Sequence, residues 1–598
     1  MAIKQSTRLR SAHLQQFDQH QAHQAAERQD HRRGCAAAGL ARRLQIGLKA
    51  RGRHRHRHQH ARGRGQDRQQ AAGIRPRDRM APDLAFAASG KRSGPPETSR
   101  RCASAKLQSA RQAGSGAVLI LVAAGFAQGF PMNVSSLSRA PAAEPRQGGD
   151  GYLLRTEADL AKLASYAIDK SAALGAAQAG AIVSEAGGIN IQVANHAVET
   201  ATRDGDQSLV VTVHQNGRTG SATTQALSRE AIDKAVEQAL AMATQLEPDE
   251  DAGLADRDAL AWATPDVPLF APSGSSAADL IQAALALEAA ALGEATGDKV
   301  RVTQAGAASR DSRWALATSQ GFCRTGGASM QSLWCQVIAE RDKAMVQDHW
   351  MSVDRQYKGL DPESVVGRRA AQRALTRLGA TTLSTRRAPV LIDATVAASL
   401  VRDLCAQLGG QAQYRRMTFL PDALGQTIAA PHLSLTEDPF EPFGLASAAF
   451  DDEGVAGKRR QVVEDGLVKG LFLGSRMARK LGLSSTGNAG GMRNLTLTSR
   501  DTRPGDDLDS MLRKLGTGLW LTRFMGGGVN PTTGAYSRAA SGFWVENGQV
   551  VGPVEGFTVA GNLQAMLQAI IAVGADVHRS GGVRTGSVLL PDLQIAGR

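Results

Sequence analysis

Apolar residues recur every three or four positions in four stretches of the chain beyond residue 150. This spacing places them on one face of a helix, so each stretch predicts an amphipathic helix that packs against a core. Ser228 is a suitable N-cap for the second of these helices, and Gly379 follows the fourth where a helix stop is expected. The predicted helices cover residues 153–180, 228–243, 277–292 and 362–378.

Between the predicted helices, short segments alternate apolar and polar residues or are rich in Val, Ile and Thr, which predicts strands. Two Asn-Gly pairs, at 216–217 and 547–548, are typical of two-residue hairpin turns. Beyond residue 379 the chain is dense in glycine and in short strands. The predicted strands before that region and at its start are 181–185, 189–193, 208–214, 221–225, 300–304, 314–318, 332–340 and 388–393.

These elements predict an α+β protein of two domains. The N-terminal domain, 153–378, combines helices with a mixed or antiparallel sheet, and the C-terminal domain, 379–598, is largely antiparallel β. Residues 132–152 are predicted to be a flexible N-terminus. The acidic and proline-rich stretch 246–275 is predicted to be a linker or a surface loop.

Charge divides the chain into two unlike parts. Residues 1–131 contain 25 Lys and Arg against 7 Asp and Glu, whereas the remaining residues contain 45 and 49. The overall charge of +14 therefore does not describe residues 132–598, the part of the chain expected to fold. It does not indicate that this part binds nucleic acid.

The basic segment 1–131 lacks a sustained hydrophobic period, so it cannot bury enough apolar surface to offset its ordering entropy. Three interpretations compete: a disordered arm that binds nucleic acid, a His-rich metal-binding tract, and upstream sequence translated ahead of a protein that begins at Met132. The third is favoured. The apolar run 117–127 is too short to span a bilayer, which needs about 20 residues.

Cysteine usage indicates a reducing compartment. After Met132 only Cys323, Cys335 and Cys405 remain, and their spacing forms neither a disulfide framework nor a CxxC metal clip. With no membrane segment predicted, we expect a cytoplasmic protein.

The stretch 516–563 carries the most specific signature in the chain. It contains the triple glycine of MGGGVN (525–530), the triplet Tyr536-Ser537-Arg538 and the segment SGFWVENG (541–548). This stretch resembles the C-terminal signature of the TldD/PmbA family of metalloprotease subunits, and within that family it is closer to the PmbA (TldE) branch. The segments 443–455 and 484–491 match family patterns as well, and the resemblance extends over 151–598.

Catalytic members of this family resemble one another in a His-Glu-x-x-x-His helix, where two imidazoles hold zinc and the Glu is the general base. Counting back from Tyr414, the corresponding positions here are Arg402, Asp403 and Gln407. Arginine is cationic and has no acceptor, and glutamine is a poor zinc ligand. The resemblance therefore implies that this chain has no catalytic residue or metal of its own. Cys405, between these positions, is interpreted as a core residue.

The glycine-rich loops of the C-terminal half suggest a peptide site, because a backbone without Cβ atoms lets another chain approach closely. Purely structural glycines would explain the same residues. The residues predicted to line a peptide groove are Asn488, Gly490, Gly491, Gly528 and Asn530. Aromatic and guanidinium groups of the kind enriched at protein interfaces are predicted at Tyr536, Arg538 and Trp544, with a core strand as the alternative.

Three consecutive carboxylates, Asp451, Asp452 and Glu453, invite an acid–base interpretation. A turn before Gly454, whose acids solvate the surface, is the favoured alternative.

Together these features predict a subunit of a TldD/PmbA-type metalloprotease complex that degrades or processes unfolded peptides. The resemblance implies a hetero-oligomer in which a TldD-like partner contributes the zinc while this chain, inactive alone, assists. The alternative is a non-enzymatic peptide-binding or modulator protein that acts without a protease partner. A nucleic-acid-binding protein remains a third interpretation only if residues 1–131 are translated.

Overall fold

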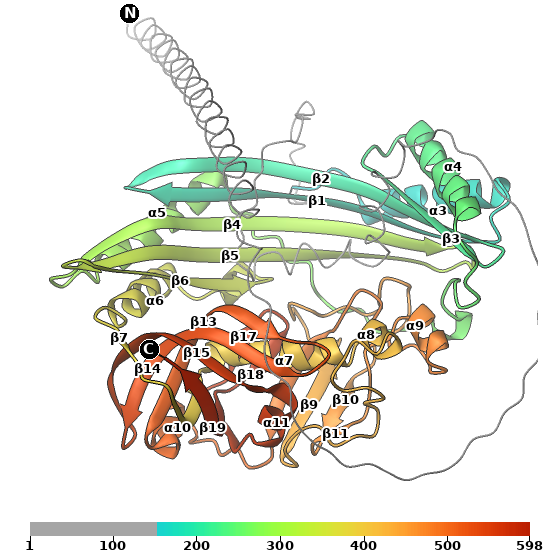
Figure 1. Cartoon of the computed structure of the whole chain (residues 1–598). Helices are drawn as coiled ribbons and strands as arrows, with labels where there is room; N and C mark the ends of the chain where they lie inside the picture. The colour runs from blue at the N-terminus through green and yellow to red at the C-terminus, as the bar shows by residue number, and fades with distance from the viewer. Residues whose placement is uncertain (1–151, 598) are drawn as a thin grey trace, which may run out of the picture. The chain divides into compact units, whose positions relative to one another are not determined.

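A computed structural model describes residues 152–597, which fall within one compact unit of the chain (Figure 1). The predictions for residues 1–131, and those for 132–151, lie outside the described residues. The α+β fold class is confirmed: long antiparallel strands and helices make up the N-terminal half, and two mostly antiparallel sheets the C-terminal half. In the described part of the chain no helix is both long and apolar enough to cross a membrane.

The N-terminal half contains a six-stranded sheet in the order β3-β2-β1-β4-β5-β6, with every neighbouring pair antiparallel. Its longest strands run side by side in Figure 1. The strands are β1 (Gln178–Ala194), β2 (Ala197–Gln215), β3 (Arg218–Thr224), β4 (Lys299–Thr318), β5 (Cys323–Arg341) and β6 (Ala344–Asp354).

Several predicted strands are parts of longer ones. The predicted strands 181–185 and 189–193 both belong to β1, which continues through Gly187 and Gly188. This glycine pair does not end the strand. Glycine is required at both positions because other parts of the backbone pass close to them. A Cβ on Gly187 would meet the Tyr152 backbone, and one on Gly188 would meet the Ser309 carbonyl oxygen. Strand β6 was not predicted at all.

Four helices cover one face of this sheet, and odd-numbered residues of β1 point toward them at both ends. Ala181 and Val183 pack beneath one helix pair, α3 (Glu157–Ala173) and α4 (Arg229–Gln245). At the other end Ile191 and Val193 pack beneath α5 (Ala277–Leu292) and α6 (Glu363–Leu375). The space between these two cores is polar and is lined by the buried residues Glu185, Ser309, Asp311, Ser329 and Gln331.

Local predictions hold where a capping residue or a turn decides the structure. The Ser228 side chain accepts a hydrogen bond from the Ala231 amide at the start of α4, as predicted. Both Asn-Gly pairs form hairpin turns with positive φ, at 51° and 70° for 216–217 and at 51° and 77° for 547–548.

The C-terminal half contains a six-stranded sheet, β11-β10-β9-β12-β18-β17, and a seven-stranded sheet, β16-β19-β8-β13-β14-β15-β7, which share one large hydrophobic core. The strands are β7 (Thr381–Thr382), β8 (Arg386–Ile392), β9 (Leu433–Asp438), β10 (Arg460–Glu464), β11 (Leu467–Val468), β12 (Asn494–Ser499), β13 (Gly518–Val529), β14 (Ala535–Glu546), β15 (Gln549–Asn562), β16 (Ala572–Val573), β17 (His578–Ser580), β18 (Val583–Thr585) and β19 (Val588–Ala596). The helices are α7 (Ala394–Gln407), α8 (Gly410–Tyr414), α9 (Ser475–Lys480), α10 (Leu508–Leu515) and α11 (Leu563–Gln568).

Candidate functional site

Helix α7 carries Arg402, Asp403 and Gln407, the positions that the sequence resemblance assigned to a zinc motif, and Asp393 fixes where this helix begins. One carboxylate oxygen of Asp393 accepts from the Thr395 amide at 3.0 Å and caps the helix. The other oxygen accepts from the indole Nε1 of Trp520 at 3.0 Å. Cys405, on the buried face of α7, lies in the large core, which confirms its interpretation as a core residue.

Arg402 points toward the hairpin formed by β17 and β18. Its Nη2 donates to the Ser580 carbonyl oxygen at 2.7 Å and to the Ser580 hydroxyl at 2.9 Å. Burial lowers the pKa of Arg402 from its ordinary value, although Asp403 opposes the shift. The guanidinium stays cationic and offers only hydrogen-bond donors.

Asp403 forms an ion pair with Arg538 of β14, with 2.8 Å between Oδ2 and Nη2. Both side chains are largely buried, at 21% and 17% exposure. Burial raises the pKa of Asp403, and the charge and hydrogen bond of Arg538 counteract this shift. The Arg538 guanidinium also lies over the rings of Phe524 and Tyr536, at 5.2 and 5.6 Å from their centroids.

Several buried polar atoms around this ion pair have no hydrogen-bond partner among the described residues. They are Oε1 of Gln407, the hydroxyl of Tyr536 and Nε of Arg538. The Gln407 carbonyl oxygen accepts from Gln413 Nε2 at 2.7 Å, which ties the end of α7 to the next helix. Within residues 152–597, no group of three or more His, Cys, Asp or Glu side chains is arranged to hold a metal ion.

The predicted peptide-binding residues fall in two separate places, the loop 484–491 and the end of strand β13, and no hydrogen bond connects the two sets in the described structure. In the first loop Asn488 is 6% exposed, and its amide is fully used. It donates to Glu437 at 2.7 Å and to the Gly491 carbonyl oxygen at 3.1 Å, and it accepts from Arg460 and Thr486. Asn488 thus holds its own loop together. Gly490 has a φ of 87°, and a Cβ there would collide with the Asp452 carboxylate.

The second set, Gly528 and Asn530, lies at the end of β13. Asn530 caps the following turn, because its side-chain oxygen accepts from the amides of Thr532 and Thr533 at 3.0 and 3.1 Å. Strand β8 pairs with β13 only at Leu519–Leu521, so one edge of residues 522–529 has no strand partner in the described chain. Met525 on this segment is 48% exposed. A strand edge without a partner offers its backbone N–H and C=O groups to another chain.

The three predicted interface residues differ in accessibility. Tyr536 is 2% exposed and lies in the core, whereas Arg538 is occupied by Asp403. Trp544 is partly buried, with the guanidinium of Arg386 5.0 Å from its ring centroid. Their role in contacting another subunit stays a prediction.

The favoured alternative, in which these acids solvate the surface, is wrong for Asp451. This side chain is 2% exposed. Its carboxylate accepts from the amides of Glu453, Val455 and Ala489, each at 2.9 Å. Burial and the neighbouring Glu453 raise the pKa of Asp451 to about 7, and the three backbone bonds counteract them. Asp451 therefore organises the loop 450–456 and attaches it to the glycine loop 484–491.

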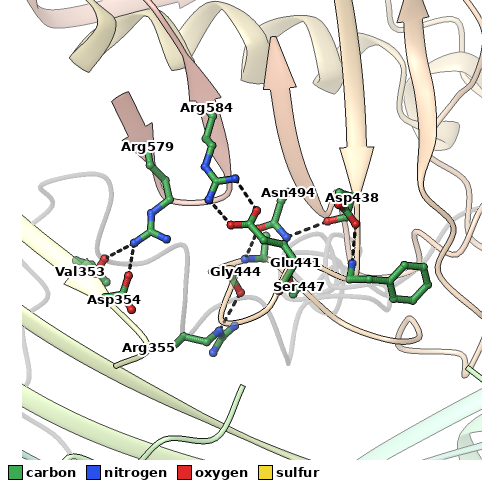
Figure 2. A network of polar contacts seen from close by, with 12 residues as sticks. Val353, Asp354, Arg355, Asp438, Glu441, Gly444, Ser447, Asn494, Arg579 and Arg584 are labelled. Carbon is green, nitrogen blue, oxygen red and sulfur yellow. Dashed lines mark hydrogen bonds and ion pairs between the residues drawn. The ribbon is translucent and has the colours of Figure 1, made fainter. Parts of the chain in front are cut away.

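Sequence analysis missed an arginine network that joins the end of β6 to the C-terminal sheets (Figure 2). Arg355 donates to the carbonyl oxygens of Gly444 and Leu445 at 2.9 and 3.0 Å. From the β17–β18 hairpin, Arg579 pairs with Asp354, and Arg584 pairs with Glu441 as a fork. The same hairpin holds Arg402 through Ser580. The sequence feature that could have indicated this network is a Gly-Gly turn flanked by arginines, RSGGVR at 579–584.

Comparison with known proteins places the chain in a family. Three family descriptions match it: PmbA/TldA metallopeptidase domain 1 over residues 180–243, the central domain over 270–378 and the C-terminal domain over 385–597. The chain is 39% identical over 423 residues to metalloprotease PmbA of Escherichia coli O157:H7, covering 70% of this chain and 91% of that protein. This chain belongs to the PmbA/TldD family of metallopeptidases.

Further relatives agree with this family membership. A metalloprotease PmbA homolog of Haemophilus influenzae is 35% identical over 457 residues, covering 76% of this chain and all of that protein. A Thermotoga maritima structure, described as a candidate modulator of a DNA gyrase, is 25% identical with a TM-score of 0.65 and covers 73% of this chain and 99% of its own. TldE of Thermococcus kodakarensis, at 18% identity and a TM-score of 0.63 over 74% of this chain and all of that one, shares the fold. The resemblance inferred from the sequence is confirmed.

Proposed function

We propose that this PmbA/TldD-family chain is the non-hydrolytic subunit of a cytoplasmic two-subunit metallopeptidase that acts on unfolded peptides. In this proposal a TldD-like partner supplies the zinc and the general base, and this chain helps hold the peptide. One observation carries the proposal: at the motif positions of α7, Arg402 and Asp403 are engaged by Ser580 and Arg538.

The residues on α7 do not fit a zinc ion. A tetrahedral zinc site needs lone pairs from imidazole, thiolate or carboxylate groups. Arg402 has none and adds a positive charge that repels a divalent cation. Asp403 does have lone pairs, but its Oδ2 already accepts from Arg538 at 2.8 Å, and a bound cation would have to displace that arginine. We therefore assign no hydrolytic step to these residues.

The open edge of β13 supports a role in peptide binding. An extended peptide can add to a free strand edge through main-chain hydrogen bonds, without regard to its side chains. A Cβ on Gly526 or Gly528 would lie in open space, so no side chain obstructs the approach of another backbone there, whereas Gly527, whose φ is 83°, packs closely against Ser537 of β14. This edge suits unfolded substrates, because main-chain bonding is independent of sequence.

The test compares the full chain alone with the chain mixed with a TldD-like protein of the same organism that contains HExxxH. We expect far less than one zinc per isolated chain by elemental analysis, and no EDTA-sensitive cleavage of a disordered casein. The mixture should cleave it. EDTA-sensitive cleavage by the isolated chain would overturn the proposed division of labour.

A variant with Arg402→His, Asp403→Glu and Gln407→His restores the motif and provides a matched comparison. We expect it to hold more zinc than the wild-type chain, since two imidazoles replace a cation and an amide. Its circular dichroism spectrum checks that it folds. Equal zinc content in the two proteins would contradict the argument from α7.

A second candidate function is a peptide-binding modulator that works without a protease partner. The open edge of β13 favours it, because strand addition requires no metal, and the Thermotoga maritima relative is described as a candidate gyrase modulator. Peptide binding by the isolated chain, together with no association with any TldD-like protein, would favour this candidate over the first.

A further inference from the structure

The segment 246–276, between α4 and α5, contacts both halves of the described chain. It contains no strand and only one short turn of 3-10 helix, Arg257–Ala259. Seven of its residues are acidic and one is an arginine. Most of it falls between the family's matched domain 1 and central domain. We call this segment the strap.

Ion pairs attach the first part of the strap to helix α9, whose sequence SRMARK has three cations and no acid. Asp249 pairs with Arg476, whose Nε is 2.7 Å away, and with Lys480 at 2.7 Å. Lys480 also pairs with Asp251 at 3.1 Å. Burial opposes ionisation of Asp249, but hydrogen bonds from Lys480 and Arg476 outweigh it and lower the pKa of Asp249 to about 2.

Arg479 makes a further attachment to the strap. Its Nη2 donates to the Leu254 carbonyl oxygen at 2.6 Å and to Asp256 at 3.0 Å, and its Nη1 donates to the Asp251 carbonyl oxygen at 3.2 Å. Several of these charged groups remain in contact with water: the exposed fractions are 51% for Arg476 and 83% for Asp256. Salt screens exposed pairs of this kind.

The middle of the strap joins the loop 450–456 through the backbone. The Ala261 amide donates to the Gly454 carbonyl oxygen at 2.9 Å, and the Ala456 amide donates to the Ala259 carbonyl oxygen at 3.0 Å. Leu260 and Val455 share a hydrophobic cluster with Phe322, the residue before β5. Asp451, in the same loop, holds the Ala489 amide, so the strap is linked through this loop to the glycine loop 484–491.

The last part of the strap covers the polar space between the two N-terminal cores. The Leu269 carbonyl oxygen accepts from the Ser329 amide at 2.9 Å, and the Ser273 hydroxyl lies 3.0 Å from that of Ser309. Beneath it, Oδ2 of Asp311 and both amide atoms of Gln331 have no partner in the described chain. The surface beneath the last part of the strap is therefore polar. If the strap moves away, water can solvate the carboxylate of Asp311 and the amide of Gln331.

We propose that the strap is a salt-sensitive fastener that holds α9 and the loop 450–456 against the N-terminal sheet, and that its release loosens the glycine loop 484–491. The ion pairs with α9 set the strength of the fastening at the first part of the strap, whereas Leu260, Ala261 and Trp262 hold its middle against Phe322. If the glycine loop binds peptide, which rests on the proposed function, the strap regulates that binding.

Hydrogen exchange of the full chain, followed by mass spectrometry, tests the strap directly. Raising NaCl from about 0.05 M to about 1 M should speed exchange roughly tenfold in peptides that cover 255–262, 450–457 and 484–491, because screening removes several exposed ion pairs. A peptide from the core of β5 should be unaffected. Equal exchange at both salt concentrations would overturn the proposal.

A variant with Asp249→Asn, Asp251→Asn and Asp256→Asn should exchange in the same peptides at low salt as fast as the wild-type chain does at high salt. The matched control is Glu247→Gln, Glu250→Gln and Asp258→Asn. It removes the same charge from the same segment, at acids that pair with no described cation. If the two variants behave alike, the ion pairs with α9 do not hold the strap. Casein cleavage with the TldD-like partner is scored separately: its failure with normal salt-dependent exchange contradicts the proposed function but not the strap.

Discussion

Two sets of ion pairs in this protein resemble each other in composition and differ in burial. On α7, Asp403 and Arg538 are both about one-fifth exposed and lie against aromatic rings and the core. At the strap, Asp249 and Asp256 meet Arg476 and Arg479 of α9, where Arg476 is 51% and Asp256 83% exposed. A further pair there, Lys480 with Asp249, is 14% and 20% exposed and so is as well covered as the pair on α7. Asp403 of the first set is one of the positions that the sequence resemblance assigned to a zinc motif. The second fastens a loop.

The difference shows that solvent access, more than the number of charges, decides what an ion pair can do. In a poorly hydrated site, removing one partner leaves a charge that water cannot reach, so the pair is fixed in place. At the surface, water and salt replace a lost partner at little cost, so the contact can open and close. We therefore expect α7 to be rigid and the strap to be adjustable.

The largest expected effect comes from breaking the pair on α7. Arg538→Met should reduce the free energy of unfolding by about 3 kcal/mol, because Asp403 is left buried without its partner. Urea denaturation followed by circular dichroism measures the loss. Adding Asp403→Asn to the Arg538→Met chain should recover part of it, since the uncompensated charge is gone. A single variant as stable as the wild-type chain would show that this pair is not fixed by burial.

A smaller loss of stability is expected when the pH is lowered. It arises at His214 of β2, near Arg479 of α9. Burial, together with the charge of Arg479, lowers the pKa of His214 from 6.5 to about 4. The unfolded chain therefore takes up the proton first. Stability should be fully retained above pH 6.5 and should decline as the pH falls toward 4, by about 2 kcal/mol after allowance for partial exposure.

The measurement is the free energy of unfolding between pH 7 and pH 4 for the wild-type chain and for His214→Gln. The variant should lose less stability over this range. His196→Gln is the control, since its side chain is 73% exposed. Parallel curves for the wild-type chain and His214→Gln would contradict the prediction.

The smallest expected effect separates the two sets by salt. A double-mutant cycle on Asp256 and Arg479, whose side chains are 83% and 27% exposed, should give a coupling energy of about 0.5 kcal/mol at low salt and close to zero in 1 M NaCl. The same cycle on Asp403 and Arg538 should give a larger coupling that salt changes little. Equal salt dependence of the two couplings would remove the distinction drawn between these regions.

Some features of the fold and the site followed from local sequence. Ser228 as an N-cap and the Asn-Gly turns were predictable, because a cap or a two-residue turn is decided by side chains within three positions. The residues assigned to the motif do lie on a helix, α7, which begins after strand β8 at the cap Asp393; their correspondence to a zinc motif stays a prediction.

Other features could not be predicted because they depend on distant neighbours. The glycine pair 187–188 looked like a break, yet β1 continues through it, since Tyr152 and Ser309 press against those positions. Asp451 looked like a surface acid until Ala489, 38 positions further along the chain, was brought to it. Asn488 looked available for a ligand, but Glu437 and Arg460 use its amide.

By itself, the sequence determined the family, the fold class and the caps and turns of single elements. Only the tertiary structure decided that Arg538, 135 positions away, pairs with Asp403, and that Arg476, 227 positions away, fastens Asp249. The reason is physical: capping and turn bonds form between residues that the chain already holds close together. An ion pair across such a separation exists only after packing has placed both charges, and the degree of burial then sets its strength.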